Sequence, residues 1–399
     1  MKKHIDQLHT ISRKPVKQII GLMSGTSLDG LDIALCRFTG SGAPTQVEVT
    51  HFATLPYDEA FKSEIRKVFA KKEIDFQHFT LLNVVVAERH AALINRFLIE
   101  EKISAEDVDL IASHGQTVFH APRIFHGLQG YPNATLQIGD GDHIACRTGI
   151  VTISDFRQKH LAAGGEGAPL ALYGDYFLFS RPGEDRFLLN IGGIGNFTFL
   201  PGDGNTQRAF ATDTGPGNTL LDAFAREMFG VPFDADARIA GNGRIDTLLL
   251  ELLKEEPFFE MSFPKTAGPE LFSSEWVRKA IQQLPKSNIN PYDLMATLTR
   301  LSAETIADAV KRVPLSGTYP QTIFLSGGGA HNPLMVSYLK ELLPEWTFAF
   351  MEELGVHGDA KEAVLFAALA NETVAGSYTE GTILGGIPLV GMGKISFPD

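Results

Sequence analysis

The chain has 399 residues, more than one hydrophobic core usually organises, so we expect two domains of about 150 to 200 residues. Hydrophobic residues make up 44% and charged residues 21%, a composition typical of a globular enzyme and not of a disordered or fibrous chain. The net charge of −12 argues against a nucleic-acid-binding surface, because such a surface needs clustered Lys and Arg to replace counterions.

The two cysteines, Cys36 and Cys146, lie far apart in apolar runs, which argues against a disulfide framework or a zinc site. Residues 1–17 are polar and lack the apolar stretch of a secretory signal. No run approaches the roughly 18 apolar residues of a membrane span. We therefore expect a cytoplasmic protein that binds neither nucleic acid nor a membrane.

The first strong feature is a predicted strand that ends in small and hydroxyl residues and resumes as a second strand. Apolar Ile19 and Ile20 lead into residues 21–32, which are rich in Gly, Ser, Thr and Asp, and apolar residues 33–36 follow. Such a turn exposes backbone N–H groups to which a phosphate can bind. Residues 187–200 repeat the pattern, which indicates two related half-molecules that face one nucleotide.

Regular elements alternate after the first hairpin. Residues 47–54 have the alternation of a strand, and residues 57–69 and 81–101 have helical periodicity. The turn-rich stretch 181–186 is the best candidate for the boundary between the halves.

Three predicted strands of the first half end in polar residues, at 108–117, 135–140 and 150–157. The carboxyl ends of strands are where α/β proteins bind ligands. The glycine-rich segment 162–170 follows the last of them and leads to a helix. We expect these polar ends to converge on one ligand site.

The second half contains further glycine-rich turns. Residues 209–218 are predicted as a strand, a turn and the start of a helix, and residues 293–313 form one long helix. A buried strand within 321–332 opens onto three glycines, which would let a flat ring or a ribose lie against the backbone. A helix at 359–373 is expected to line that region.

The ordered set of motifs resembles the actin-like superfamily of sugar kinases and heat-shock ATPases, and within it one family, the anhydro-N-acetylmuramic acid kinases. The resemblance covers residues 18–398. It is carried by Met23–Asp32, Ser113–Thr117, Leu136–Gly139, Asp155–Arg157, Ala162–Gly165, Gly167–Leu170, Asn190–Asn196, Asp213–Asn218 and Gly327–Leu334.

This resemblance implies an α/β fold of two actin-like ATPase domains, with ribonuclease H-like mixed sheets flanked by helices and an interdomain cleft. We expect an N-terminal extension at residues 1–17, then a domain at 18–182 with the phosphate hairpin and the sugar site. A second domain, at 183–399, would carry the second phosphate hairpin and the adenosine site. A homodimer is compatible with this arrangement.

The resemblance also implies a reaction. ATP phosphorylates O6 of anhydro-N-acetylmuramic acid while water attacks C1 and opens the 1,6-anhydro bridge, giving N-acetylmuramic acid 6-phosphate and ADP in cell-wall recycling. Asp29 or Asp32 would hold Mg²⁺ through water, because Mg²⁺ takes few direct carboxylates. ATP would contact Gly25, Thr26, Ser27, Leu28, Asp29, Gly30, Leu31, Asp32, Gly192, Gly193, Asn196, Asp213, Thr214, Gly215, Gly217, Asn218, Gly327, Gly328 and Gly329.

The sugar site implied by the resemblance lies at the polar strand ends of the first half. Arg157 either binds the lactyl carboxylate of the sugar or pairs with Asp155, and we favour the pair. The expected sugar-binding residues are His114, Gln116, Thr117, Gln137, Gly139, Asp155 and Arg157.

The catalytic base is where this sequence departs from the family. The family carries an aspartate where this chain has His160, and a glutamine where it has Glu166. His160 could serve as the base, since its ordinary pKa is close to cellular pH, or Glu166 could supply the carboxylate. Glu362 matches a family glutamate that helps to hold the water.

If neither residue replaces the aspartate, ring opening is lost. The chain would then be a kinase for another anhydro-sugar or sugar, or an inactive sensor that binds nucleotide and sugar.

Overall fold

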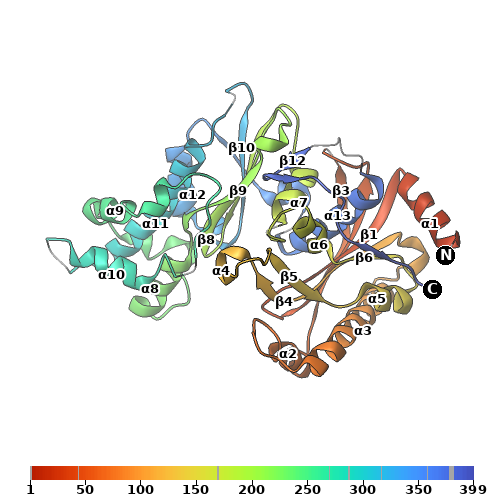
Figure 1. Cartoon of the computed structure of the whole chain (residues 1–399). Helices are drawn as coiled ribbons and strands as arrows, with labels where there is room; N and C mark the ends of the chain where they lie inside the picture. The colour runs from red at the N-terminus through yellow and green to blue at the C-terminus, as the bar shows by residue number, and fades with distance from the viewer. Residues whose placement is uncertain are drawn as a thin grey trace. The chain divides into compact units, whose positions relative to one another are not determined.

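The structure is a computed structural model that describes residues 2–43, 45–168, 170–268, 270–285, 288–315, 317–356, 358–376 and 382–399. The chain forms two compact units (Figure 1). The first unit consists of Met1–Ser180 and Leu354–Asp399, and the second consists of Arg181–Glu353.

The first unit is built on a mixed sheet in the order β14-β6-β4-β1-β2-β3, with β5 paired to β4. β1, β2 and β3 are successively antiparallel, whereas β4 and β6 run parallel to β1. The carboxyl ends of β1, β4 and β6 therefore share one edge. The bounds are β1 Val16–Ser24, β2 Gly30–Thr39, β3 Gln46–Pro56, β4 Leu110–Ala121, β5 Ala134–Ile138, β6 Thr152–Ser154 and β14 Lys394–Ser396.

Helices pack on the sheet of the first unit, and no helix in the described ranges is long and apolar enough to cross a membrane. The α-helices are α1 Lys2–Arg13, α2 Glu59–Arg66, α3 Phe76–Glu100, α4 Arg123–His126, α5 Gly141–Thr148, α6 Phe156–Ala162, α7 Ala171–Phe179 and α13 Lys361–Ala375. Shorter elements are the 3₁₀ turns Ala105–Asp107 and Gly358–Ala360 and the strand pair β12 Ile383–Leu384 and β13 Ile387–Pro388.

The two faces of β1 contact different helices, because side chains alternate along a strand. Ile20 and Leu22 belong to the core cluster that includes Val86 of α3. Gly21 points to the other face, where α13 lies. A Cβ at position 21 would be 1.9 Å from the carbonyl oxygen of Ala363, so only glycine lets the helix come this close.

The second unit repeats this plan with a sheet in the order β11-β10-β7-β8-β9. β7, β8 and β9 are successively antiparallel, and β10 and β11 extend the sheet in parallel with β7. The strands are β7 Asp185–Ile191, β8 Ile194–Leu200, β9 Phe210–Pro216, β10 Gln321–Ser326 and β11 Thr347–Phe350. The α-helices are α8 Thr219–Phe229, α9 Thr247–Lys254, α10 Ser274–Gln282, α11 Pro291–Lys311 and α12 Pro333–Leu342.

The core of the second unit lies around α11. The side chain of Asn290 accepts a hydrogen bond from the backbone of Tyr292, and Pro291 takes the first helical position, as is common at helix starts. Leu294, Leu298 and other residues of α11 belong to the core cluster of this unit, and among the strands α11 packs mainly on β9. The 3₁₀ turns of this unit are Thr206–Arg208, Ala235–Ala237, Ala240–Asn242, Pro257–Glu260 and Gly328–His331, and one more, Met351–Leu354, ends it.

The two sheets share one topology, because β3-β2-β1-β4-β6 and β9-β8-β7-β10-β11 have the same order and the same strand directions. The α/β class with two related mixed sheets, each flanked by helices, is confirmed. The predicted helices 57–69, 81–101, 293–313 and 359–373 correspond to α2, α3, α11 and α13, with ends that differ by a few residues.

The packing of the chain ends differs from the expected division. We expected residues 354–399 in the second domain, but they pack with the first unit because the apolar face of α13 is buried on β1, β2 and β4. Residues 2–13, which we expected in an extension, form α1, whose Ile11 and His4 are buried. His4 Nε2 contacts the side-chain carboxylate of Asp399.

Replacing Gly21 with Ala tests the close contact between β1 and α13. The added Cβ must displace the backbone of Ala363, so we expect a loss of about 1–3 kcal/mol in the free energy of unfolding, measured by urea denaturation. Gly241→Ala is the matched control, because a Cβ there meets nothing within 4 Å. Equal stability of the two variants would contradict the contact.

Candidate functional site

The turn of the first hairpin, residues 25–29, exposes Thr26, Ser27 and Asp29 to solvent. Leu28 has a φ of 61°, in the left-handed region that costs a non-glycine residue about 1–2 kcal/mol. Its side chain is buried in the core of the first unit, which offsets that cost. Packing under the turn thus holds its polar residues outward, as binding of an anionic phosphate requires.

A buried chain of hydrogen bonds supports the turn from below. The Ser24 hydroxyl lies 2.5 Å from Gln116 Oε1 and 2.8 Å from the Tyr57 hydroxyl, which lies 2.9 Å from His90 Nε2. Burial lowers the pKa of His90 to about 4, so this ring is neutral at physiological pH. The sequence analysis did not single out Tyr57 or His90, which a single sequence does not distinguish from other core residues.

Gln116 and Thr117, predicted to bind sugar, make contacts within the protein. Gln116 is fully buried, and its Nε2 donates to the carbonyls of Gly25 and Thr117. The Thr117 hydroxyl accepts from Gln137 Nε2 at 3.1 Å. Gln116 therefore supports the turn at residues 25–29, and Thr117 orients Gln137.

Asp29 and Asp32, the predicted metal ligands, lie at the start of β2. Asp29 is exposed, and Asp32 accepts a hydrogen bond from the Thr54 hydroxyl at 2.6 Å. Leu31 and Ile33 face the α3 side, so Asp32 faces the α13 side. The described residues contain no cluster of three or more His, Cys, Asp or Glu able to hold a metal. Two carboxylates at an open turn still fit Mg²⁺, which keeps most of its waters.

Arg157, just after β6, and His114, within β4, form the centre of a polar cluster. Arg157 Nε donates to His114 Nε2 at 3.0 Å, and its Nη1 donates to the carbonyl of Gly167 at 2.7 Å. Burial and the adjacent Arg157 lower the pKa of His114 to about 3, so the ring is neutral and accepts. It packs against Phe366 of α13, with ring centroids 4.7 Å apart.

The expected Asp155–Arg157 pair is wrong. Asp155 forms an ion pair with Lys394 of β14 at 2.5 Å, while Arg157 binds His114 and Gly167. Asp155 has a φ of 57°, and the bend at the end of β6 turns its carboxylate toward the C-terminal strand. Only the folded sheet, with β14 paired to β6, could reveal this partner.

His160 is a buried residue that closes the glycine-rich loop after α6. Its Nδ1 accepts a hydrogen bond from the backbone N–H of Gly167 at 3.0 Å, and its ring meets Tyr173 edge-on. A Cβ at Gly165 would lie within 2.6 Å of three atoms of this ring. Burial and then Arg157 lower the pKa of His160, which keeps it neutral.

The two candidate carboxylates differ in their surroundings. Glu166 is exposed on the glycine-rich loop. Glu362 lies in the first turn of α13, where the helix N-terminus favours a negative charge. Its side chain is exposed, but desolvation by the neighbouring protein raises its pKa. Arg157 opposes the rise, and Asp32 adds to it.

A recess of about 550 Å³ lies beside this cluster in the first unit. Four predicted sugar-binding residues line it: His114, Gln137, Gly139 and Asp155. The sequence analysis missed Asn83, Asp140, Lys394 and Ser396, which come from α3, the start of α5 and β14. A recess of this size and polarity suits a small polar ligand.

In the second unit, the hairpin turn 191–194 is tied to the turn before α8. The backbone N–H groups of Gly217 and Asn218 donate to the carbonyls of Gly193 and Gly192, both at 2.8 Å. A Cβ at Gly217 would be 2.3 Å from the carbonyl of Gly192, so glycine is required there. Asn196 pairs with Asn190 across the strands.

Asp213 and Thr214 make internal contacts that position β9. Asp213 Oδ2 accepts from the backbone of Ala267 at 2.8 Å, and the Thr214 hydroxyl donates to the carbonyl of Gly195 at 2.9 Å. Lys265 Nζ donates to the carbonyls of Phe258 and Phe259, and burial lowers its pKa to about 8. This lysine was not predicted as a site residue.

Two of the three glycines after β10, Gly327 and Gly329, lie against β7. Gly327 has a φ of 80°, and a Cβ there would be 2.6 Å from Asn190 Oδ1. A Cβ at Gly329 would be 2.2 Å from Ile191 Cγ2. An adjoining recess of about 510 Å³ is lined by Ala330, His331, Pro333, Val336, Ser337, Lys340 and Phe350. The His331 and Phe350 rings are nearly parallel, with centroids 6.3 Å apart.

Comparisons with known proteins agree with one another. The family model described as "Anhydro-N-acetylmuramic acid kinase" matches residues 17–382. A protein named anhydro-N-acetylmuramic acid kinase from Pseudoalteromonas atlantica is 48% identical, with both chains covered completely. A relative of the same name from Caldanaerobacter subterraneus is 38% identical over 98% of this chain and all of its own length.

Solved structures are more distant. A ROK family glucokinase from Streptomyces griseus, in complex with glucose and AMPPNP, is 12% identical and has a TM-score of 0.34. The match covers 99% of the glucokinase chain and 89% of this chain.

The raised pKa of Glu362 predicts a pH-dependent cost in stability. Below the ordinary glutamate pKa of about 4.3, both folded and unfolded chains are protonated there, and no cost arises. As the pH rises, the unfolded chain loses its Glu362 proton first, so the free energy of unfolding falls. The loss is complete above the pKa of Glu362 in the folded chain, because desolvation there disfavours the charge. Glu362→Gln should therefore unfold at a higher temperature than the unchanged chain at pH 7 and at the same temperature near pH 4, measured by calorimetry. A difference that does not vary with pH would contradict this origin.

Proposed function

The chain belongs to the anhydro-N-acetylmuramic acid kinase family and is a sugar kinase, and from this premise we propose that it converts 1,6-anhydro-N-acetylmuramic acid and ATP into N-acetylmuramic acid 6-phosphate and ADP. The observation that carries the proposal is the grouping of Glu362, Arg157 and His114 at the carboxyl edge of the first sheet, on the α13 side that Asp32 also faces. A reaction in the cytoplasm and a homodimer remain predictions.

The reaction requires one base and one phosphoryl acceptor. Water attacks C1 and the C1–O6 bond breaks, so the water proton must pass to a base. O6 forms a bond to the γ-phosphorus of ATP, and the bond from that phosphorus to the bridging oxygen breaks to release ADP. The enzyme therefore has to place a base, the sugar and the γ-phosphate in line.

We propose Glu362 as that base. Its raised pKa makes the ionised carboxylate a stronger proton acceptor, and Arg157 helps to keep it ionised. His160 lacks a free lone pair, because Nδ1 accepts from Gly167 and the neutral ring then carries its proton on Nε2. His160 thus orders the loop that carries Glu166, and Glu166 is the alternative base.

The first hairpin would bind the phosphates. Residues 25–32 provide backbone N–H groups and hydroxyls at the exposed turn, supported by Gln116. Asp29 and Asp32 would hold Mg²⁺ through water, and this ion, when bound, neutralises phosphate charge. Asp32, on the α13 side, would orient that water shell.

The remaining ATP contacts would come from the second unit. Its first hairpin and the segment at the end of β9 contain Gly192, Gly193, Asn196, Asp213, Thr214, Gly215, Gly217 and Asn218. These segments would bind through their backbone, since the Thr214 hydroxyl and the carboxylate of Asp213 are already bonded. The recess next to Gly327, Gly328 and Gly329 has room for a purine beside the His331 and Phe350 rings.

The sugar would bind in the first unit. His114, Gln137, Gly139 and Asp155 line the recess of the first unit, and we propose that the sugar binds among them. Lys394 lines this recess, and Arg157 does not. The lactyl carboxylate of the sugar would therefore bind Lys394 and not Arg157.

The substrate assay tests the proposed function. The purified protein is incubated with Mg-ATP and 1,6-anhydro-N-acetylmuramic acid in ¹⁸O-labelled water, with levoglucosan and N-acetylmuramic acid in parallel. We expect ADP and a ring-opened 6-phosphate that carries ¹⁸O at C1. ADP release with N-acetylmuramic acid but not with the anhydro-sugar would indicate an ordinary sugar kinase, and no ADP with any sugar would overturn the proposal.

Substitutions identify the base. Glu362→Gln should lower kcat by about 10²–10⁴-fold with little change in the KM for ATP, because it removes the proton acceptor. His160→Asn can still accept from Gly167 N–H and should keep most activity, and Glu166→Gln should also remain active. Steady-state ADP release measures all three variants. An inactive, well-folded His160→Asn together with an active Glu362→Gln would assign the base to His160.

A further inference from the structure

The start of α13 is joined to α7 by a buried ion pair. Asp175 of α7 is only 3% exposed, and its Oδ1 lies 2.9 Å from Lys361 Nζ. The helices are close here, because a Cβ at Gly174 would be 2.2 Å from Leu365 Cδ1. A buried carboxylate therefore holds the ammonium group of the residue immediately before Glu362.

Three charged groups of the first unit act on Glu362 from the elements around it. They are Arg157 of α6, Asp32 of β2 and Lys361 of α13 itself. Arg157 is fixed by His114 and by the carbonyl of Gly167. Lys361 is a flexible side chain by nature, and its contact with Asp175 fixes it.

We infer that the Asp175–Lys361 ion pair is a positioning element for the proposed base: it fixes the first turn of α13 and holds a positive charge beside the Glu362 carboxylate. The inference rests on the proposed role of Glu362 and adds residues that the sequence analysis did not single out. A buried pair of this kind contributes little to stability compared with well-packed apolar residues, so specific orientation is the better reason for it.

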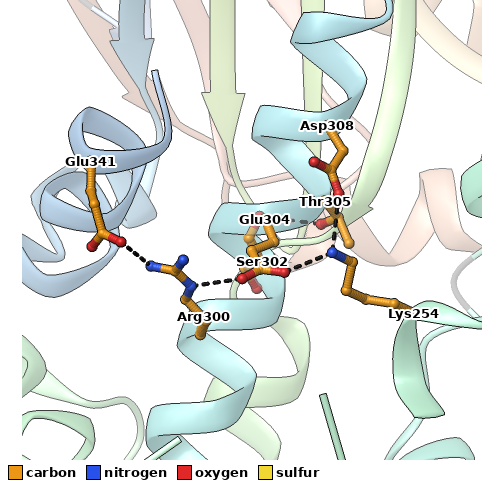
Figure 2. A network of polar contacts seen from close by, with 7 residues as sticks. All are labelled: Lys254, Arg300, Ser302, Glu304, Thr305, Asp308 and Glu341. Carbon is orange, nitrogen blue, oxygen red and sulfur yellow. Dashed lines mark hydrogen bonds and ion pairs between the residues drawn. The ribbon is translucent and has the colours of Figure 1, made fainter. Parts of the chain in front are cut away.

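A comparable lysine ion pair joins α9 and α11 of the second unit. Neither of these helices contains a proposed site residue. Lys254 contacts Glu304 at 2.7 Å and Asp308 at 3.2 Å, and Glu304 also binds Arg300, which reaches Glu341 (Figure 2). The side chains of Lys254 and Lys361 are equally exposed, at 28%. Lys254→Met therefore removes a comparable ion pair without a catalytic neighbour.

The experiment measures the titration of Glu362 directly and the pH dependence of kcat/KM. Glutamate labelled with ¹³C at the side-chain carboxyl is incorporated, and Glu362→Gln identifies the Glu362 resonance by its disappearance. Lys361→Met should shift the Glu362 titration to higher pH, because a nearby positive charge is lost. The same substitution should also move the acidic limb of the pH profile of kcat/KM to higher pH and lower kcat roughly tenfold. Lys361→Arg should restore both, and Lys254→Met should change neither.

The outcomes separate this inference from the proposed function. If Lys361→Met lowers only the unfolding temperature and leaves the titration and kcat unchanged, the pair is structural and the inference is overturned. If the unchanged chain has no activity on the anhydro-sugar, the proposed function fails, while the Glu362 titration still decides whether Lys361 acts on it. Asp175→Asn, which frees Lys361 without removing its charge, should lower kcat with a smaller shift in titration.

Discussion

The contact between Gly21 of β1 and the backbone of Ala363 in α13 is the constraint on which the first unit depends. Side chains usually separate the backbone of a helix from the sheet on which it packs. Here the backbone of α13 contacts the backbone of β1 directly. This brings the start of α13, and Glu362 with it, to the carboxyl edge of the sheet, where a helix N-terminus and the strand ends meet. It also explains why the C-terminal segment belongs to the first unit: without α13, that face of β1, β2 and β4 would lie open to water.

The polar groups at this edge differ in burial and in whether they bond within the protein. His114 and His90 are so deeply buried that both are neutral, and each serves as a hydrogen-bonding partner within the protein. His160 is bonded to the Gly167 backbone. Glu362, in contrast, faces a cation, reaches solvent and has a raised pKa. The buried histidines are thus neutral hydrogen-bonding partners, whereas Glu362 is a carboxylate with a raised pKa, the kind of group that we propose as the general base.

The sequence predicted the features that arise from local pattern. The two hairpins, the polar strand ends and the long helices were all visible as periodicity and glycine placement, because such signals extend over only a few neighbouring residues. Partners that are distant in sequence were not predictable. Nothing near Asp155 indicates that it pairs with Lys394, and nothing near Glu362 indicates Asp175. The roles expected for Gln116 and His160 came from motif position, which does not reveal that their polar atoms bond to Gly25 and Gly167.

The duplicated topology carries different chemistry in its two copies. In the second unit, α11 also approaches its hairpin closely, since Gly195 and Gly215 lie against Ile306 and Thr305. The buried polar residues of α11 are the neutral Thr297, Thr299, Ser302 and Thr305, whose hydroxyls donate to carbonyls, as Ser302 does to Gly217. Its charged residues, such as Glu304, take part in the network on another face of the helix. These hydroxyls donate to carbonyls of α11 itself or, for Ser302, of a glycine turn, whereas α13 of the first unit begins with a lysine and a glutamate. In our proposal, proton transfer therefore falls to the first turn of α13, whose residues can ionise, whereas α11, whose buried polar residues are neutral, supports a glycine turn of the second unit.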